Sequence, residues 1–241
     1  MLIGVDMKAL EWKTLLQYSQ DQVGLEELQK GLDLHTENQK FFSLPTRLVS
    51  KKYLFRTIYN RGEGYAFTVD PDFMDVSTSV EYWDDIGKKF YSKYAGVNAL
   101  HLSWKADLEN QGYIESPIGR QHHIPLLTPY GKINWNTFTN HPNQGLGADV
   151  MCIFRASLGG RLKKLPWGKH VKLMQTVHDS VMSDAPSDLT EKVARLYHEV
   201  ARDIPANIKK IFNVNWNVPL ECETYYGMDQ KNTQELKIVL D

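Results

Sequence analysis

The sequence predicts an α+β fold in which strand-forming segments at the two ends of the chain enclose a mostly helical block. Short apolar runs bounded by turn residues open the chain and recur in its last third. Between them, residues 21–123 have the pattern of helices interrupted by glycine and proline. With 241 residues, of which 42% are hydrophobic and 24% charged, the chain can bury one large core or two modest ones. We therefore expect a domain assembled from both ends of the chain.

The first element is expected to be a strand that ends in a carboxylate. Residues 2–5 form an apolar run that stops at Asp6, and residues 10–16 show the apolar spacing of a helix. The elements expected after the helical block are paired strands over 124–135 with a turn at 129–131, a helix over 145–158, a hairpin over 171–184, an amphipathic helix over 189–211 and a late strand over 218–223.

Composition excludes several classes of protein. The net charge is −1, from 28 Lys and Arg against 29 Asp and Glu, so a nucleic-acid partner would have to be met by local basic patches. Two cysteines are too few for a disulfide framework, and neither a signal peptide nor a membrane span is evident, so we expect a cytoplasmic protein with no membrane partner. Taken alone, the two basic patches are more simply solvated surface; they are Arg155, Arg161, Lys163, Lys164, Lys169 and Lys172, and Lys88, Lys89 and Lys93.

Two aspartates stand at strand ends. Asp6 follows the opening strand, and Asp179 lies at the tip of the expected hairpin. Mg²⁺ takes oxygen ligands and completes its shell with substrate phosphates, so two carboxylates can hold two Mg²⁺ ions for a nucleotidyl transfer. Turn and capping roles are commoner for such aspartates, so the pair alone is weak support for that chemistry.

A stripe of four side chains marks one helix. Arg47, Lys51, Phe55 and Tyr59 recur every four residues, so each is displaced by only about 40° around the helix from the one before. Two cations followed by two aromatics match the polarity of a nucleoside triphosphate, whose phosphates need charged donors and whose base stacks. On spacing alone, a core stripe with flanking surface cations is an equally good interpretation.

Five segments, in family order, resemble motifs of the family A (DNA polymerase I type) DNA polymerases. Residues 4–11, Gly-Val-Asp-Met-Lys-Ala-Leu-Glu, resemble motif A, and the stripe of Arg47, Lys51, Phe55 and Tyr59 resembles motif B. Val177-His178-Asp179 resembles motif C. The other similar segments are 33–36, which corresponds to the fingers before motif B, and 140–149, which corresponds to the helix that approaches the primer-template. The resemblance spans essentially the whole chain, as far as Gly227.

This resemblance implies a polymerase palm, an antiparallel sheet with packed helices, and an inserted, mostly helical fingers subdomain. The expected boundaries are 1–20 for the palm with motif A, 21–123 for the fingers with the motif B helix at about 45–60, and 124–241 for the rest of the palm with the motif C hairpin at about 171–184. The thumb and exonuclease regions of the family are expected to be absent, as in a split phage-type polymerase whose separate N-terminal fragment completes the palm. Residues 2–5 would then form a strand with an unpaired edge.

The resemblance also implies roles for single residues in DNA synthesis from dNTPs on a primer-template. Asp6 and Asp179 would hold two Mg²⁺ ions, Arg47 and Lys51 would grip the triphosphate with Lys51 counted among the catalytic residues, and His35 would add a phosphate contact. Glu11 resembles the steric gate against ribonucleotides, braced by Tyr59, and Phe55 would pack against the sugar. Contacts to primer and template are implied for Gln144, Asn140 and His178.

Two positions depart from the family pattern, and two other functions stay open. Ser180 stands where the family commonly has glutamate, and Asn136 where an arginine is usual, which puts one minor-groove contact in doubt. A single-subunit RNA polymerase would share the His178-Asp179-Ser180 segment, although Glu11 argues against it. The other alternative is a non-catalytic fragment that binds DNA or assembles with a partner.

Overall fold

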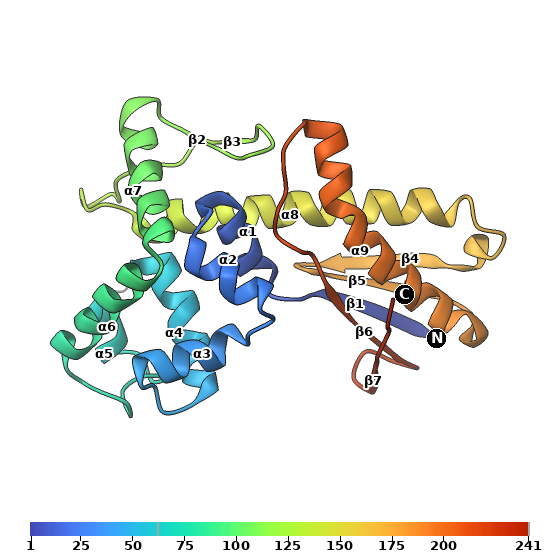
Figure 1. Ribbon diagram of the computed structural model, residues 1–241, viewed down its shortest axis with the longest axis horizontal. Coiled ribbons are helices and arrows are strands. Elements are labelled where there is room, and N and C mark those ends of the chain that lie inside the picture. The colour runs from blue at the N-terminus through green and yellow to red at the C-terminus, as the bar shows by residue number, and fades with distance from the viewer. Residues whose placement is uncertain (62, 241) are drawn as a thin grey trace. The chain divides into compact units, whose positions relative to one another are not determined.

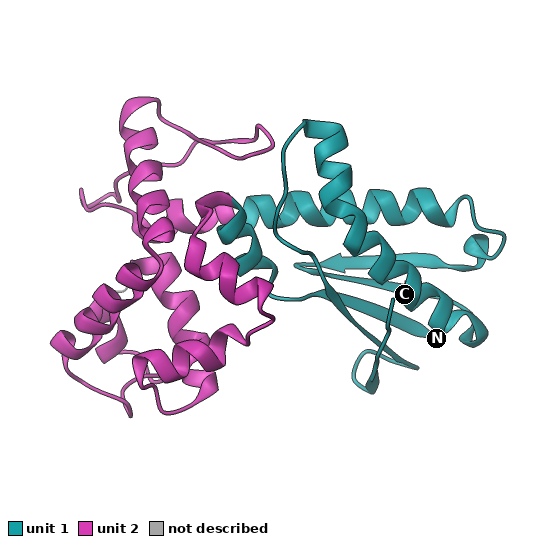
Figure 2. Cartoon of the chain, in the orientation of Figure 1, with its two compact units in different colours: residues 1–17, 144–241 teal, residues 18–143 magenta. Residues whose placement is uncertain are grey.

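The computed structural model describes residues 1–61 and 63–240, and it has the mixed helical and antiparallel-sheet architecture of the α+β class (Figure 1). The chain divides into two compact units, one made of residues 1–17 and 144–241 and the other of residues 18–143 (Figure 2). No helix in these described ranges combines the length and the apolar character needed to cross a membrane.

The first unit is built on a five-stranded antiparallel sheet in the order β4-β5-β1-β6-β7. The strands are β1 (Leu2–Met7), β4 (Lys172–Val177), β5 (Ser180–Asp184), β6 (Cys222–Gly227) and β7 (Thr233–Leu236). Since β1 pairs with β5 on one side and with β6 on the other, the expectation of an unpaired edge at residues 2–5 is wrong. Both neighbours of β1 come from the last third of the chain, so the expectation of a sheet assembled from both ends is confirmed.

Helix α9 (Thr190–Phe212) covers this sheet with one continuous apolar face. Its buried side chains recur every three or four residues, which is the spacing of an amphipathic helix packed on a core. Tyr197 on this face reaches the sheet, where its hydroxyl donates to the Ile3 carbonyl at 3.3 Å and also bonds with Ser183. The unit further contains α1 (Leu10–Ser19) up to residue 17, most of α8 (Trp135–Leu162) and two short 3-10 turns, η1 (Gly168–His170) and η2 (Ser187–Leu189).

The second unit is helical around an aromatic core. Tyr53 lies within 5.3 to 6.4 Å, between ring centroids, of Phe42, Phe67, Trp83 and Phe90, so one phenol ring joins several helices through apolar burial and ring contacts. The helices are α2 (Gln22–Gln29), α3 (Leu34–Phe42), α4 (Arg47–Asn60), α5 (Gly64–Thr68), α6 (Val80–Lys93) and α7 (Ala95–Asn110), and a small hairpin pairs β2 (Ile114–Glu115) with β3 (Gln121–His122).

Two expected strand segments differ from the structure. Over 124–135 the chain forms a turn with a single bridge between Leu127 and Ile133, and α8 already begins at Trp135. The late strand starts at Cys222 rather than at residue 218, because Pro219 has no N–H to donate to a ladder.

Candidate active site

Two aspartates lie on neighbouring backbone segments at one end of the sheet in the first unit. Asp6 forms the last register pair between β1 and β5, and its partner is Ser180, the first residue of β5. Next to it, the Met7 amide donates to the Asp179 carbonyl at 3.0 Å. Both aspartates are only partly buried, so a polar ligand can reach them from solvent. The structure therefore brings the two predicted metal ligands onto neighbouring backbone segments, although they are 173 residues apart in sequence.

The turn that carries Asp179 is tight. His178 and Asp179 are the two residues that separate β4 from β5, and His178 has a positive φ of 50°. Such a conformation suits the two-residue loop of a hairpin. The His178 side chain is exposed, so in this unit it is free of the packing that would bury a core histidine.

Tyr225 on β6 is a residue of this site that the sequence interpretation missed. It is the register partner of Gly4, and a Cβ added to Gly4 would lie 2.1 Å from the Tyr225 ring, so the ring covers the glycine. Gly4 and Asp6 face the same side of β1 because side chains alternate along a strand. Burial raises the pKa of the Tyr225 phenol, and the negative charges of Asp6 and Asp179 raise it further, while a hydrogen bond with Ser180 opposes the shift.

Glu11 is held by a residue of the same unit. It lies in the first turn of α1, and its Oε1 accepts a hydrogen bond at 3.3 Å from Nε2 of Gln144 on α8. Glu11 is partly buried and Gln144 is exposed. The two helices approach closely here, since a Cβ on Gly147 would be only 3.7 Å from Leu10. Gln144 was predicted as a DNA contact, and its position beside Glu11 had no signal in the sequence.

In the second unit, α4 presents the predicted stripe on its more accessible side. Arg47 and Lys51 are exposed, and Phe55 and Tyr59 are partly buried. The opposite side of the helix is buried in the aromatic core and consists of Ser50, Tyr53, Leu54, Thr57 and Ile58. The stripe is thus distinct from the packing face of the helix, which disfavours the interpretation that it is simply core.

The first half of the stripe forms an electrostatic cluster with α3. The Arg47 guanidinium donates to both carboxylate oxygens of Asp33. Its Nε lies 3.1 Å from each oxygen, and its Nη2 lies 2.5 Å from Oδ2. Asp33 also caps α3 by accepting from the Thr36 amide. The hydrogen bonds from Arg47 hold the pKa of Asp33 well below its usual range.

His35 belongs to the same cluster. Burial lowers the pKa of its imidazole, and the nearby charges of Arg47 and Lys51 lower it further. Its ring lies 6.1 Å from that of Phe55, measured between centroids. Its Nδ1 is buried and has no hydrogen-bond partner within the described residues. An imidazole with an unsatisfied nitrogen, next to two cations, suits a contact to a phosphate or another polar ligand.

The second half of the stripe is fixed by the start of α8. The Tyr59 carbonyl accepts from the Thr139 hydroxyl at 2.9 Å, and the Asn143 side chain donates to the Tyr59 phenol at 3.4 Å. Asn140 lies in the same turn of α8, and its buried Oδ1 has no hydrogen-bond partner in the part of the chain that the structure describes.

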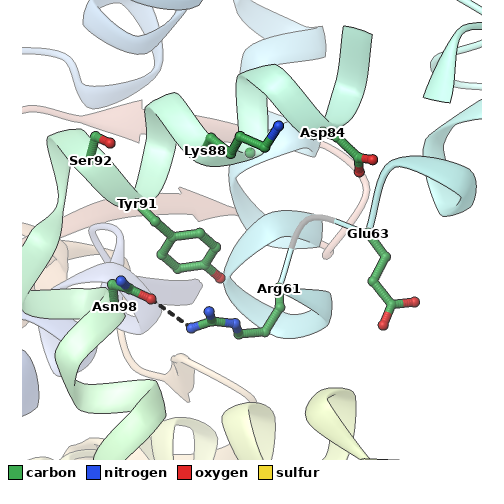
Figure 3. A pocket seen from close by; sticks show the side chains of 8 residues that line it. Arg61, Glu63, Asp84, Lys88, Tyr91, Ser92 and Asn98 are labelled. Atoms are coloured by element: carbon green, nitrogen blue, oxygen red, sulfur yellow. Dashed lines mark hydrogen bonds between the residues drawn. The ribbon is translucent and has the colours of Figure 1, made fainter. Parts of the chain in front are cut away.

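Two hollows flank these residues in the second unit. One of about 410 Å³ is lined by Lys51 and Phe55 of the stripe, together with residues of the segment after α5. The other, of about 490 Å³, surrounds Arg61, which lies 4.6 Å from the ring centroids of Tyr91 and Trp135 and bonds to Asn98 (Figure 3). The second hollow contains none of the predicted site residues.

The two aspartates at the end of the sheet can hold a metal ion only if a bound ligand supplies further oxygen atoms. Among residues 1–61 and 63–240, no group of three or more His, Cys, Asp or Glu side chains is arranged to hold a metal ion. Asp6 and Asp179 supply two oxygen-bearing groups, which suits Mg²⁺ when substrate phosphates complete the shell.

Comparisons with known proteins agree on one family. The model for DNA polymerase family A matches residues 1–232. Thermostable DNA polymerase I from Thermus aquaticus is 25% identical over 242 residues, which cover 98% of this chain and 27% of that protein. DNA polymerase I from Geobacillus stearothermophilus is 22% identical, over 94% of this chain and 25% of the relative. This chain thus spans about a quarter of the length of these relatives.

A solved structure shows the same fold. The POL domain of Pol1 from M. smegmatis, in complex with DNA primer-template and dNTP, superposes with a TM-score of 0.78 at 19% sequence identity. The superposition covers 94% of this chain and 39% of the other.

Proposed function

Because the chain belongs to DNA polymerase family A, we propose that it carries the catalytic region of a DNA-directed DNA polymerase, which adds deoxynucleotides from dNTPs to the 3′-hydroxyl of a primer. The strongest support is the placement of Asp6 and Asp179 on neighbouring backbone segments at one end of the sheet. The related polymerase domain was solved with DNA primer-template and dNTP, which supports the same partners for this chain. A cytoplasmic location follows as part of the proposal.

The carboxylates would act through Mg²⁺. Two ions bound by Asp6, Asp179 and the triphosphate would activate the primer hydroxyl and stabilise the leaving pyrophosphate. Both aspartates are only half-buried, so the incoming phosphates can reach them from solvent. Ser180, the residue after Asp179, supplies no charge, so Asp6 and Asp179 carry the proposed metal site.

The cluster on α3 and α4 would bind the nucleotide. Lys51 is exposed and has no carboxylate at ion-pair distance among the described residues, so its charge is available to a triphosphate. Arg47 would share its guanidinium between Asp33 and a phosphate, and the unsatisfied imidazole of His35 would add a hydrogen bond. Phe55 would pack against the sugar.

The remaining predicted contacts concern DNA. We assign His178, Asn140 and Gln144 to the primer and template, and the two compact units to palm and fingers. The units divide at residues 17/18 and 143/144, so the proposed fingers include residues 124–143, which the sequence interpretation gave to the palm.

A separate N-terminal fragment is a further part of the proposal. This chain corresponds to only 27% of the Thermus aquaticus relative, and efficient primer extension would need polypeptide that supplies the remaining DNA contacts. Extension assays with and without such a fragment test this point, and full processive synthesis by residues 1–241 alone contradicts it.

Substitution of Asp179 tests the catalytic proposal. Asp179→Ala is expected to lower primer extension at least about a thousandfold, because metal stabilisation of the transition state is worth several kcal/mol. Binding of a labelled primer-template is expected to change little. Asp188→Ala, an exposed aspartate of η2 in the same unit, is the matched control and should retain wild-type synthesis. Unchanged synthesis by Asp179→Ala would remove the proposal.

Glu11 separates DNA synthesis from RNA synthesis. Glu11→Ala is expected to raise the use of ribonucleotides relative to deoxynucleotides by about tenfold or more, because the space for a 2′-hydroxyl opens. Glu11→Gln keeps the size of the side chain and serves as the control for a steric gate. If the wild-type chain incorporates ribonucleotides as readily as deoxynucleotides, the RNA polymerase alternative is the correct one.

A further inference from the structure

Two residues of the predicted basic patch, Arg161 and Lys164, line a cavity in the first unit, away from the strand ends that carry Asp6 and Asp179. The cavity has a volume of about 360 Å³ and lies between α9 and the segment after α8. Arg161 and Lys164 reach it from the end of α8, and Lys192 and Arg195 from α9. Neither the proposed metal site nor the nucleotide site uses any of these residues.

The cations of the cavity exceed its carboxylates. The positive charge of Arg161 is balanced by carboxylates, since Arg161 pairs with Asp203 and lies 3.8 Å from Glu199. Lys164, Lys192 and Arg195 have no carboxylate within ion-pair distance among residues 1–61 and 63–240. The Arg195 guanidinium donates only to a backbone carbonyl, that of Val239, at 3.3 Å. The rim of the cavity therefore favours a negatively charged ligand.

The floor of the cavity is apolar. Leu196 is buried, and Leu165 and Trp167 are partly buried, so all three present apolar surface to the hollow. Proteins contact a DNA backbone through charged and polar groups that bind the phosphates, and this requires no apolar cavity. Proteins that bind single-stranded DNA stack successive bases on several aromatic side chains. One indole beside two leucines instead suits the insertion of one apolar side chain.

The loop that carries Trp167 is held in place by its backbone. The Gly168 amide donates to the Leu165 carbonyl at 3.0 Å, and a Cβ on Gly168 would lie 1.9 Å from the carbonyl oxygen of Leu162. Only glycine permits that approach between the loop and the end of α8. The cavity is thus formed before a ligand arrives, which lowers the entropic cost of binding.

We propose that this cavity binds an acidic peptide segment of a partner protein, with one apolar side chain of the peptide inserted against Trp167 and Leu196. The carboxylates of the peptide pair with Lys164, Lys192 and Arg195. Surface complementarity of this kind steers association and fixes orientation, so the site recruits a protein to the chain without contributing to the chemistry of synthesis.

Fluorescence polarisation with a defined probe tests the proposal. The probe is a fluorescein-labelled peptide of five aspartates followed by glycine, leucine and phenylalanine, titrated with residues 1–241 at physiological salt. We expect saturable binding, and at least about tenfold weaker binding of a peptide in which serine replaces leucine and phenylalanine. No saturable binding of the first peptide, or equal binding of the second, overturns the proposal.

Charge reversal locates the binding site. Lys192→Glu and Lys164→Glu are each expected to weaken binding of the probe about tenfold or more, since each removes an attraction and adds a repulsion. Lys210→Glu, an exposed lysine of the last turn of α9, is the matched control and should bind within about twofold of the wild type. Thermal melts by circular dichroism verify that all three variants fold.

An oligonucleotide distinguishes a peptide from nucleic acid as the occupant. Unlabelled oligo(dT) with the same formal charge as the probe is added as a competitor. The proposal requires that the oligonucleotide displaces the probe at least about tenfold less effectively than the unlabelled peptide does. Equal displacement shows a general anion surface and overturns the proposal. An unchanged affinity of Lys192→Glu and Lys164→Glu for the probe shows that the peptide binds elsewhere, and it also overturns the proposal.

Discussion

His101 shows how a single buried group can make the stability of the fold depend on pH. It lies on α7 with no exposed surface, 3.5 Å from the Tyr91 hydroxyl, and burial together with the charge of Arg61 lowers its pKa to about 3. Between that value and the ordinary histidine pKa, the unfolded chain binds a proton that the folded chain does not. Acidification from about pH 7.5 to 5.5 should therefore lower the free energy of unfolding by about 1.4 kcal/mol through this residue alone.

Urea unfolding at the two pH values measures this contribution by difference. His101→Gln removes the titrating group. The free energy of unfolding of this variant should therefore fall on acidification by about 1.4 kcal/mol less than that of the wild type. His141→Gln changes an exposed histidine of the same unit and should retain the wild-type pH dependence. An identical pH dependence for His101→Gln and the wild type contradicts the assignment.

At the same scale, the sequence contains a clearer signal for charged residues than for the residues that surround them. Asp6 was predicted as a metal ligand because an apolar run ends in a carboxylate; the structure places it opposite Ser180 on a neighbouring strand, and its role stays a prediction. Tyr225 was missed, because the contact between its ring and Gly4 joins positions 221 residues apart. A glycine inside a strand, two residues before a carboxylate, was the available signal for such a close approach.

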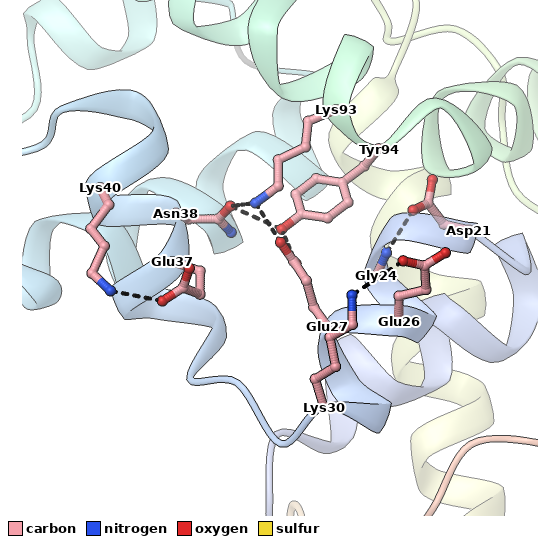
Figure 4. Close-up of polar contacts among 10 residues, drawn as sticks. All are labelled: Asp21, Gly24, Glu26, Glu27, Lys30, Glu37, Asn38, Lys40, Lys93 and Tyr94. Carbon is pink, nitrogen blue, oxygen red and sulfur yellow. Dashed lines mark hydrogen bonds and ion pairs between the residues drawn. The ribbon is translucent and has the colours of Figure 1, made fainter.

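Among the elements of the second unit, a buried polar cluster ties α2 and α3 to the end of α6 (Figure 4). The Lys93 ammonium lies 2.8 Å from both Glu27 and Asn38, and the Tyr94 hydroxyl donates to Glu27 at 2.7 Å and to Asn38 at 2.9 Å. Lys93 was predicted as part of a basic surface patch. That interpretation is wrong for this lysine, whose side chain is only 9% exposed.

Removal of one partner from this cluster should be costly. Lys93→Met leaves the Glu27 carboxylate, itself only 15% exposed, without its cation, so the free energy of unfolding should fall by about 3 kcal/mol. Chemical denaturation monitored by circular dichroism measures the loss. The double variant Lys93→Met, Glu27→Leu removes both charges and should recover part of it.

An exposed pair on α2 provides the control for this cluster. Lys30 and Glu26 lie one helical turn apart, 3.4 Å from each other, with both side chains more than 60% exposed. Lys30→Met should therefore change the free energy of unfolding by less than about 0.5 kcal/mol. If Lys93→Met is no more destabilising than Lys30→Met, the cluster does not hold these helices together.

Helices were easier to predict than strands in this chain. The helix over 189–211 corresponds closely to α9, because its apolar period of three to four residues persists over six turns. The segment 124–135 has apolar residues beside a Pro-Tyr-Gly turn, as a hairpin does, but its strand pairing is limited to one bridge, Leu127–Ile133, with the backbone hydrogen bonds from Thr128 to Lys132 and from Asn134 to Leu126. Strand pairing depends on partners that are distant in sequence, and a local pattern of residues contains little information about them.

For the whole molecule, the position of β1 decides which parts can fold alone. Residues 18–143 form one continuous segment with its own aromatic core, so this fragment should unfold cooperatively by itself. Residues 144–241 contain β4, β5, β6 and β7 but lack the strand that joins β5 to β6. Without β1 the two hairpins share no ladder, and each alone is at most marginally stable.

Expression of the two fragments tests this dependence on β1. Fragment 18–143 should give a dispersed amide spectrum and a sigmoidal melt, whereas fragment 144–241 should give neither until a peptide of residues 1–17 is added in trans. A matched peptide with Val5→Asp, which places a charge at a buried position of β1, should fail to restore the fold because an unpaired buried charge is strongly unfavourable. Cooperative unfolding of fragment 144–241 alone would mean that the sheet is stable without its central strand, contrary to the pairing of β1 on both of its edges.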